Sequence, residues 1–270
     1  MTSDAESRPA TAARVTARAR ILAVTSGKGG VGKTFVSANL AAALAQRGER
    51  VLVLDADLGL ANLDVVLNLF PKITLHDVFT GKAELEQAIL PAPGGFSVLL
   101  AGSGLVEYSR LTPEVSEKLR DVIEQVAPRF DRILLDTGAG ISDVVLYAVS
   151  LADEVLVVAT PEPTSLTDAY ATIKVLATQQ QRSGVRLLVN QVTRQGEGRV
   201  IRGQLQQVVD RYVSPQMHDP SAPFKLELLG EVPIDTAVRE AVQKRRLLLE
   251  LQPGSPAAQG ISAAAERLAS

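Results

Sequence analysis

Cysteine and tryptophan are absent from this chain of 270 residues, and histidine occurs only twice, at His76 and His218. Without cysteine the chain can form no disulfide, iron–sulfur cluster, thiolate-ligated zinc site or thiolate nucleophile. The two histidines are far apart in the sequence, and neither has metal-ligand spacing around it. Aromatic residues make up only 4% of the chain, which leaves few platforms for stacking nucleic-acid bases. Metal chemistry in this protein must therefore use oxygen ligands.

Long hydrophobic runs are also missing. No stretch approaches the roughly 18 consecutive apolar residues that a membrane-spanning helix needs. Residues 1–20 contain no apolar segment typical of a secretory signal, and their four arginines outnumber their two acidic residues. We expect residues 1–20 to form a flexible basic leader and the protein to be cytoplasmic.

No sign of charge dominates. The 28 lysines and arginines and the 30 acidic residues give a formal net charge of −2 at pH 7. This near-neutral balance argues against a protein whose main role is to coat nucleic acid. With 46% hydrophobic and 21% charged residues the chain can bury a core, and its length fits one α/β domain.

Short apolar runs alternate with segments of helical periodicity from Ile21 onward. The apolar runs are nearly continuous, as in strands buried on both faces, and lie at 21–25, 51–55, 97–100, 133–136, 155–159, 186–190 and 226–230. Helical spacing occurs at 34–47, 113–127, 166–181 and 199–212. This alternation predicts an α/β fold with a mostly parallel, doubly wound sheet and helices on both faces. No linker interrupts it, so we expect a single domain over residues 21–270.

The string Ser-Gly-Lys-Gly-Gly-Val-Gly-Lys-Thr at residues 26–34 follows the first predicted strand and opens the first predicted helix. It matches the P-loop pattern G-x-x-x-x-G-K-[ST] in the structural context that the pattern requires. Its glycines allow backbone N–H groups to converge on phosphate oxygens at the positive end of the helix. We expect Lys33 to reach the β- and γ-phosphates of ATP and the Thr34 hydroxyl to hold Mg²⁺. The predicted nucleotide-binding residues are Gly27, Gly29, Gly30, Val31, Gly32, Lys33, Thr34 and Phe35.

Three carboxylates end two of the predicted strands. Asp55 and Asp57 follow the second strand, and Asp136 ends the apolar run 133–136 in the manner of a Walker B aspartate. In a doubly wound sheet this edge lines the ligand crevice. Carboxylates there can orient an attacking water or hold Mg²⁺ and its bound waters. We expect Asp136 to reach Mg²⁺.

Lys28 is a second lysine inside the loop, and an ordinary P-loop does not need it. With this lysine, the loop resembles the deviant Walker A motif of the MinD/ParA family of P-loop NTPases, which have the SIMIBI-like fold. The resemblance implies an ATP-dependent homodimer in which Lys28 reaches across to the partner's nucleotide, a catalytic role like that of an arginine finger. It also implies that Asp57 positions the attacking water and that Asp55 supports the Mg²⁺ shell.

Asn190 ends a predicted strand, and Pro233 follows another in Gly230-Glu-Val-Pro233. The resemblance implies that these two residues flank the adenine base. Judged without it, Asn190 is equally well explained as a turn residue at the end of a strand.

Longer strings resemble one branch of the family, FlhG (also called YlxH or FleN), which controls flagellar number and placement. They lie at 55–64, 136–141, 160–170, 238–242 and 255–258. This resemblance implies a slow, partner-stimulated ATPase whose partner is an FlhF-like GTPase or a flagellar component. Two departures stand out: residues 1–20 lack the segment that activates the GTPase, and the last predicted helix, 257–268, lacks the basic amphipathic face of a membrane anchor. We expect that helix to pack on the core, so membrane or cell-pole contact would come through a partner.

Two alternatives stay open beside a switch that controls flagella. A ParA-type partitioning ATPase would bind DNA through surface residues such as Arg199, Arg202, Lys244, Arg245 and Arg246. An ATP-dependent ligase of the dethiobiotin synthetase type would share the loop variant but act on a small acid.

Overall fold

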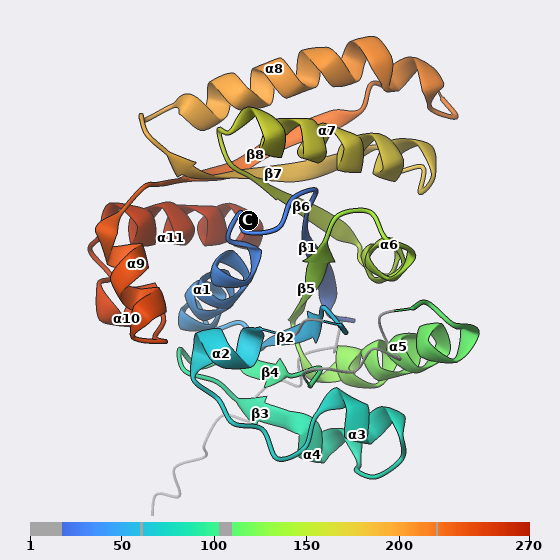
Figure 1. The fold of residues 1–270 in the computed structure, drawn as a ribbon, viewed down its shortest axis with the longest axis vertical. Coiled ribbons are helices and arrows are strands. Elements are labelled where there is room, and N and C mark those ends of the chain that lie inside the picture. Colours follow the sequence, from blue (N-terminus) through green and yellow to red (C-terminus); the bar gives the residue numbers. More distant parts are fainter. Residues whose placement is uncertain (1–17, 60–61, 103–109, 220) are drawn as a thin grey trace, which may run out of the picture.

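An eight-stranded sheet forms the centre of the structure, a computed structural model that describes residues 18–59, 62–102, 110–219 and 221–270. The strands are β1 Arg20–Ser26, β2 Val51–Ala56, β3 Ile89–Pro91, β4 Ser97–Leu99, β5 Arg132–Ala139, β6 Glu154–Ala159, β7 Gly184–Val192 and β8 Lys225–Pro233. Their order is β3-β4-β2-β5-β1-β6-β7-β8, and every neighbouring pair is parallel except β3 and β4. β1 lies in the middle, between β5 and β6 (Figure 1).

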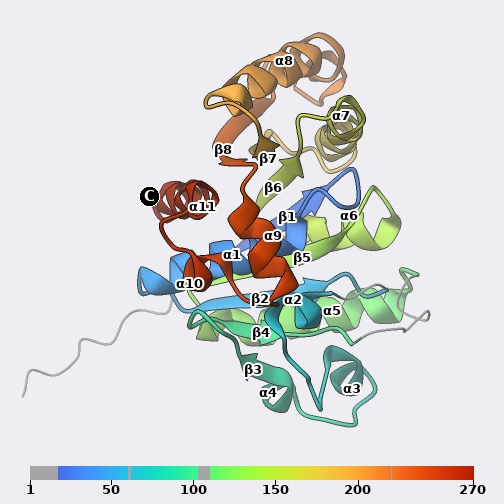
Figure 2. The ribbon, with the colours of Figure 1, turned by 60° about the vertical axis from the view of Figure 1, so that its left-hand side comes forward.

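Helices cover both faces of this sheet (Figures 1 and 2). They are α1 Lys33–Gln46, α2 Leu63–Leu67, α3 Leu75–Phe79, α4 Leu85–Ala88, α5 Pro113–Val126, α6 Asp143–Ser150, α7 Pro163–Thr178, α8 Glu197–Tyr212, α9 Thr236–Gln243, α10 Leu248–Leu251 and α11 Pro256–Ala269. The core under α1, α9, α10 and α11 is separated by the sheet from the core under α5, α6, α7 and α8. The predicted α/β fold, a mostly parallel doubly wound sheet with helices on both faces, is confirmed.

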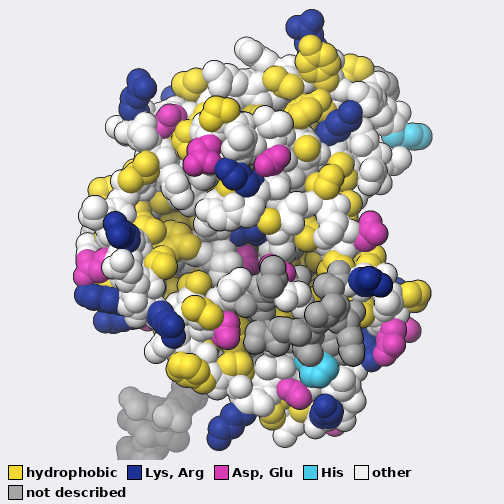
Figure 3. Space-filling view, in the orientation of Figure 1, with side chains coloured by type: hydrophobic (Ala, Val, Ile, Leu, Met, Phe, Trp, Pro, Cys, Tyr) yellow, Lys and Arg dark blue, Asp and Glu magenta, His cyan; other side chains and the backbone are white. Residues whose placement is uncertain are grey.

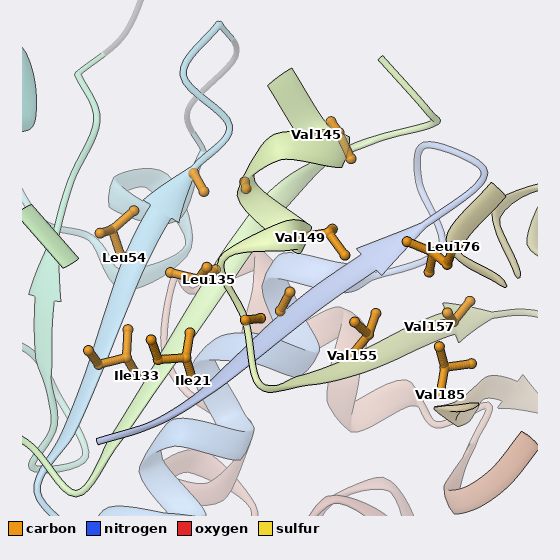
Figure 4. Close-up of a cluster of buried hydrophobic side chains, with 14 of the residues drawn as sticks. Ile21, Leu54, Ile133, Leu135, Val145, Val149, Val155, Val157, Leu176 and Val185 are labelled. Atoms are coloured by element: carbon orange, nitrogen blue, oxygen red, sulfur yellow. The ribbon is translucent and has the colours of Figure 1, made fainter. Parts of the chain in front are cut away.

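The two cores explain why the strands are apolar almost without interruption. Successive side chains of a strand point to opposite faces of the sheet. In β2, Leu54 therefore belongs to one core and its neighbour Val53 to the other, and both side chains are fully buried. Figure 4 shows part of the core under α5, α6, α7 and α8, where Leu54 and Leu135 of the sheet gather with Val145 and Val149 of α6. A strand covered on both sides has no position for a polar side chain except at its ends.

Each predicted strand and each predicted long helix is present, with bounds that differ by a few residues. β1 begins at Arg20, inside the segment 1–20 predicted to be a leader, and residues 1–17 of that segment lie outside the described residues. β3 is not predicted from the sequence because it has three residues, includes Pro91 and pairs only with β4. Six helices of four to eight residues are also missed, since so short a segment shows no clear periodicity.

The C-terminal helix α11 packs on the core, as the sequence predicts. Its buried residues are Ala257, Ala258, Ile261, Ala264, Ala265 and Leu268. Arg132, which is 3% exposed, donates to the Leu268 carbonyl at 3.0 Å and satisfies part of the helix end. Among the helices that the structure describes, none is both long and apolar enough to span a membrane.

Asn39 connects the helix that follows the P-loop to the C-terminal helices. It lies in α1 and is 1% exposed. Its Oδ1 accepts hydrogen bonds from the backbone N–H of Leu248 at 2.8 Å and of Leu249 at 3.3 Å, and its Nδ2 donates to the Phe35 carbonyl at 2.9 Å. The side chain thus satisfies backbone groups at the start of α10 that α10 itself cannot.

Replacing Asn39 with Ala leaves two buried N–H groups without their acceptor. We expect the free energy of unfolding to fall by about 1–3 kcal/mol, measured by urea denaturation followed by circular dichroism. Gln259→Ala, at an exposed position of α11, is the control and should change it by less than about 0.5 kcal/mol. Equal stability of the two variants would contradict this role of Asn39.

Candidate functional site

The P-loop curls between β1 and α1 through two glycines in the left-handed region. Gly30 has a φ of 79° and Gly32 a φ of 93°, values that only glycine adopts without strain. The Gly32 carbonyl accepts from Val36 N–H at 2.9 Å, so the loop joins α1 without a break. Lys33 and Thr34 form the first turn of α1, where backbone N–H groups have no partner inside the helix. This arrangement is an anion-binding helix N-terminus.

Residues of α7 and β7 contact the P-loop on the side away from the pocket that it forms. A Cβ on Gly27 would stand 2.1 Å from the Asp168 carbonyl oxygen of α7, so only glycine fits there. Asn190, at the end of β7, donates from Nδ2 to the Val31 carbonyl at 2.8 Å. The same Nδ2 would stand 2.5 Å from a Cβ on Gly32. Gly27, Val31 and Asn190 therefore fix the shape of the loop from outside the pocket that it forms.

A pocket of about 590 Å³ opens in front of the loop at the carboxyl edge of the sheet. Figure 3 shows a hollow near the middle of this face, with acidic and basic side chains visible at its floor. Predicted residues in its wall are Gly29, Gly30, Gly32, Lys33, Thr34, Phe35 and Asp57. The pocket is also lined by residues that no sequence motif indicates as ligands: Asn62, Thr137, Ser142, Val144 and Val145. The walls thus bring together the P-loop, the start of α1, the ends of β2 and β5 and the start of α6.

Two carboxylates lie side by side at this edge of the sheet, at the ends of β2 and β5. Asp55 and Asp136 are partners in the register of β2 and β5, and are 1% and 3% exposed. Burial raises the pKa of Asp136 to about 6, and hydrogen bonds from Thr34 and Ser37 oppose that rise. Burial, then the charge of Asp136, raises the pKa of Asp55 well above its usual range. Two adjacent buried carboxylates need a cation or a proton, and oxygen donors of this kind suit Mg²⁺.

Lys33 and Asp57 face these carboxylates. Burial lowers the pKa of Lys33, and the charges of Asp136 and Asp57 offset part of the fall. The Asp57 carboxylate packs against Gly138, where an added Cβ would stand 3.4 Å from the Asp57 Cγ. The backbone N–H of Asp57 donates to Asp55 Oδ1 at 3.2 Å. One lysine and three carboxylates therefore lie close together beside the loop.

Lys28 does not line this pocket. Its Nζ donates to Glu162 Oε2 at 2.8 Å and to Thr164 Oγ1 at 3.0 Å, both at the start of α7. The Lys28 side chain is 38% exposed and that of Glu162 61%, so the pair lies at the surface and is weak. The structure thus separates the two lysines of the loop, one at the pocket and one beside α7.

The two predicted adenine contacts do not line the pocket either. Asn190 is turned to the P-loop, and Pro233 lies next to it at the end of β8, since Asn190 pairs with Val232 in the strand register. Their contact with a base therefore stays a prediction.

The basic residues proposed for DNA binding do not gather on one face. Arg199 and Arg202 lie on α8, at the top of Figure 1, whereas residues 244–246 follow α9, at its left. Lys244 pairs with Glu240 at 2.6 Å and Arg246 with Glu250 at 4.0 Å, so acidic neighbours compensate part of this charge. In Figure 3 the basic side chains near α9 and α10 have acidic ones beside them.

The fold and the loop together define a P-loop nucleotide-binding protein. A ParA family model, described as NUBPL iron-transfer P-loop NTPase, matches residues 17–269. The chain is 43% identical to the antiactivator FleN of Pseudomonas aeruginosa over 92% of this chain and 86% of that protein. It is 32% identical to the flagellum site-determining protein YlxH of Helicobacter pylori, over 93% of this chain and 82% of that protein.

A solved structure agrees with these relatives. The septum site-determining protein MinD complexed with Mg-ADP from Pyrococcus horikoshii superposes with a TM-score of 0.71 and 30% identity, over 93% of this chain and 96% of that one. The chain therefore belongs to the ParA family of P-loop NTPases, and the resemblance to its MinD and FlhG branches is confirmed.

The raised pKa of Asp136 predicts that this carboxyl lowers the free energy of unfolding as the pH rises. Because the native carboxyl holds its proton up to about pH 6 and the unfolded one releases it near 3.8, stability falls as pH rises between these values. Without nucleotide and Mg²⁺, Asp136→Asn should raise the free energy of unfolding by about 1–3 kcal/mol at pH 8, with a smaller gain at pH 5. Urea unfolding in EDTA measures this. A gain that is equal at both pH values, as expected for the exposed control Asp210→Asn, would contradict it.

Proposed function

We propose that the chain is an ATP-dependent dimeric switch that hydrolyses ATP to ADP and phosphate and thereby controls the number or placement of flagella. One observation carries the proposal: the pocket of the P-loop is lined by Lys33 but not by Lys28, the other lysine of the loop. Lys28 is held at the surface by a weak pair with Glu162, so it can leave for the nucleotide of a second subunit at little cost.

Each side chain of the site has a separate role in binding or hydrolysing ATP. Lys33 and the N–H groups of the loop bind the phosphates, and Thr34 and Asp136, which are already hydrogen-bonded to each other, would hold Mg²⁺ with support from Asp55. A Mg²⁺ ion held there would supply positive charge that offsets the charge of the phosphates. Asp57 positions the attacking water from the pocket wall. Lys28 of the second copy stabilises the charge that develops on the γ-phosphate.

Adenine recognition is assigned to the adjoining strand ends. Asn190 and the backbone near Pro233 lie next to each other at the carboxyl edges of β7 and β8. We assign them to the base because Asn190 contacts the phosphate-binding loop and Pro233 lies beside Asn190. Asn190 would then have two roles, contact with the base and support of the P-loop, since its Nδ2 already donates to the Val31 carbonyl.

The names of the relatives support a role in flagellar control. FleN is called an antiactivator and YlxH a flagellum site-determining protein. We infer a protein partner, either an FlhF-like GTPase or a flagellar component, which stimulates hydrolysis and brings this cytoplasmic chain to the membrane or cell pole. Transfer of an iron–sulfur cargo is a poor fit, because the chain has no cysteine to ligate iron. Partitioning through DNA is less well supported, because the basic residues considered for it are divided between distant elements.

Lys28→Ala tests the role of the second lysine. Because Lys28 lies outside its own pocket, we expect the variant to bind a fluorescent ATP analogue within about threefold of the unmodified protein while ATP turnover falls at least about 100-fold. Phosphate release measures turnover, and Lys82→Ala, at an exposed lysine, is the control. Unchanged turnover in Lys28→Ala would remove the proposed role.

Asp57→Ala tests the ATP-bound dimer. Without the residue that positions water, the protein should bind MgATP, fail to hydrolyse it and accumulate as a dimer of about twice 28.7 kDa. Gel filtration with light scattering measures the mass with and without MgATP. Lys33→Ala, which should not bind the nucleotide, is the matched control and should stay monomeric. A monomeric Asp57→Ala protein in saturating MgATP would overturn the dimer.

A further inference from the structure

A second, smaller pocket lies beside the nucleotide pocket and shares no wall residue with it. Its volume is about 290 Å³. Its wall consists of Asp55, Asp64, Leu69, Phe70, Pro71, Thr74, Leu100 and Gly102. It is therefore built from the end of β2, the helix α2 with the segment that follows it, and the residues after β4.

Two carboxylate oxygens in this wall have no hydrogen-bond partner among the described residues: Asp55 Oδ2 and Asp64 Oδ1. Asp55 is 1% exposed, and neither carboxylate forms a salt bridge with any described residue. Buried acceptors are normally satisfied, since a buried polar atom without a partner costs free energy. Both oxygens are buried, and Asp55 also accepts a hydrogen bond from the backbone N–H of Leu63. A donor from outside the described chain therefore reaches them only when part of the pocket wall moves aside.

The rim of the pocket is apolar. Phe70 is 80% exposed, which is the largest exposure among the exposed large hydrophobic residues of the described chain, and Leu69 and Pro71 flank it. Val65, on the neighbouring helix α2, is a further exposed apolar residue at 47%. An aromatic ring at the rim and carboxylates inside favour a ligand with a cationic head and an apolar stem.

A metal ion is a poorer match than an organic cation. Asp55 and Asp64 are the two acidic side chains that the wall of this pocket offers to a metal, and Asp55 is already assigned to the Mg²⁺ of the nucleotide pocket. Two carboxylates with an aromatic neighbour suit a guanidinium group, which donates several hydrogen bonds in one plane, sheds water easily and stacks on aromatic faces.

We propose that this pocket binds an arginine side chain presented by a partner protein. The guanidinium group donates to Asp55 and Asp64, and its aliphatic stem packs on Phe70. The apolar rim favours an arginine that belongs to a protein over a small free cation, because only a protein segment can also cover Phe70 and Val65. This site goes beyond the proposed ATPase function. It is linked to the nucleotide pocket through Asp55, whose Oδ1 accepts a hydrogen bond from the backbone N–H of Asp57.

The lack of tryptophan in the chain provides a direct test. Phe70→Trp places a single tryptophan at the rim, and its fluorescence is titrated with the blocked tripeptide Gly-Arg-Gly and with the same peptide carrying neutral citrulline. We expect a saturable response to the arginine peptide and binding at least about fivefold weaker for citrulline. Adding Asp64→Asn to Phe70→Trp should weaken binding of the arginine peptide at least about fivefold, whereas Glu117→Gln, an exposed acid on α5, should not.

Calorimetry gives a second readout that needs no tryptophan. Phe70→Ala should weaken binding of the arginine peptide at least about threefold relative to the unmodified protein. No saturable response to arginine, equal responses to arginine and citrulline, or equal binding by the Asp64→Asn and Glu117→Gln variants would overturn the proposal. Each variant is also titrated with MgATP, so a failure of this site is distinguished from a failure of the nucleotide pocket.

Discussion

The register of β2 on β5 places Asp55 directly beside Asp136, and the charge balance of the whole site follows from this contact. Both strands are buried on both faces, so neither carboxylate can turn to water. Thr34, Ser37 and the N–H of Asp57 supply hydrogen bonds, and Lys33 supplies positive charge at the pocket. These groups offset only part of the cost of burial, as the raised pKa of Asp136 indicates. A folded protein keeps such a pair where a bound cation completes it.

The same contact divides the edge of the sheet into two pockets. Asp136 is hydrogen-bonded to Thr34 of the P-loop, whereas Asp55 is part of the wall of the pocket beside Phe70. One carboxylate pair can thus be neutralised from two sides, by Mg²⁺ with the nucleotide and by a donor from a partner. Asp57 stands between them, since its N–H is bound to Asp55 while its side chain lines the nucleotide pocket.

The sequence predicted those features that depend on local pattern. The strands were found because burial on both faces requires continuous apolar runs, and the P-loop because its glycines and Lys33 stand at fixed spacing. Side-chain direction was not available from pattern. Asn190, which is predicted to contact the base, also donates to the Val31 carbonyl, and Lys28 is paired with Glu162, which lies 134 residues away in the sequence.

The small pocket was beyond sequence analysis for the same reason. Its wall joins residues from three segments whose short helices carry no clear periodicity. The structure places Asp64 in the first turn of α2, with one carboxylate oxygen buried. Only the folded chain shows that this oxygen shares a pocket with Asp55.

The central claim is that Lys28 acts on the nucleotide of the other subunit, and mixing two inactive variants tests it most directly. In a mixed dimer of Lys28→Ala with Asp57→Ala, the Lys28→Ala subunit keeps its own Asp57 and receives Lys28 from its partner, so one of the two sites is complete. We predict that ATP turnover, near zero for either variant alone, reappears when they are mixed. If Lys28 acted within its own subunit, no site in the mixture would be complete. A mixture as inactive as its components, under conditions where the mixed dimer is shown to form, would contradict the account.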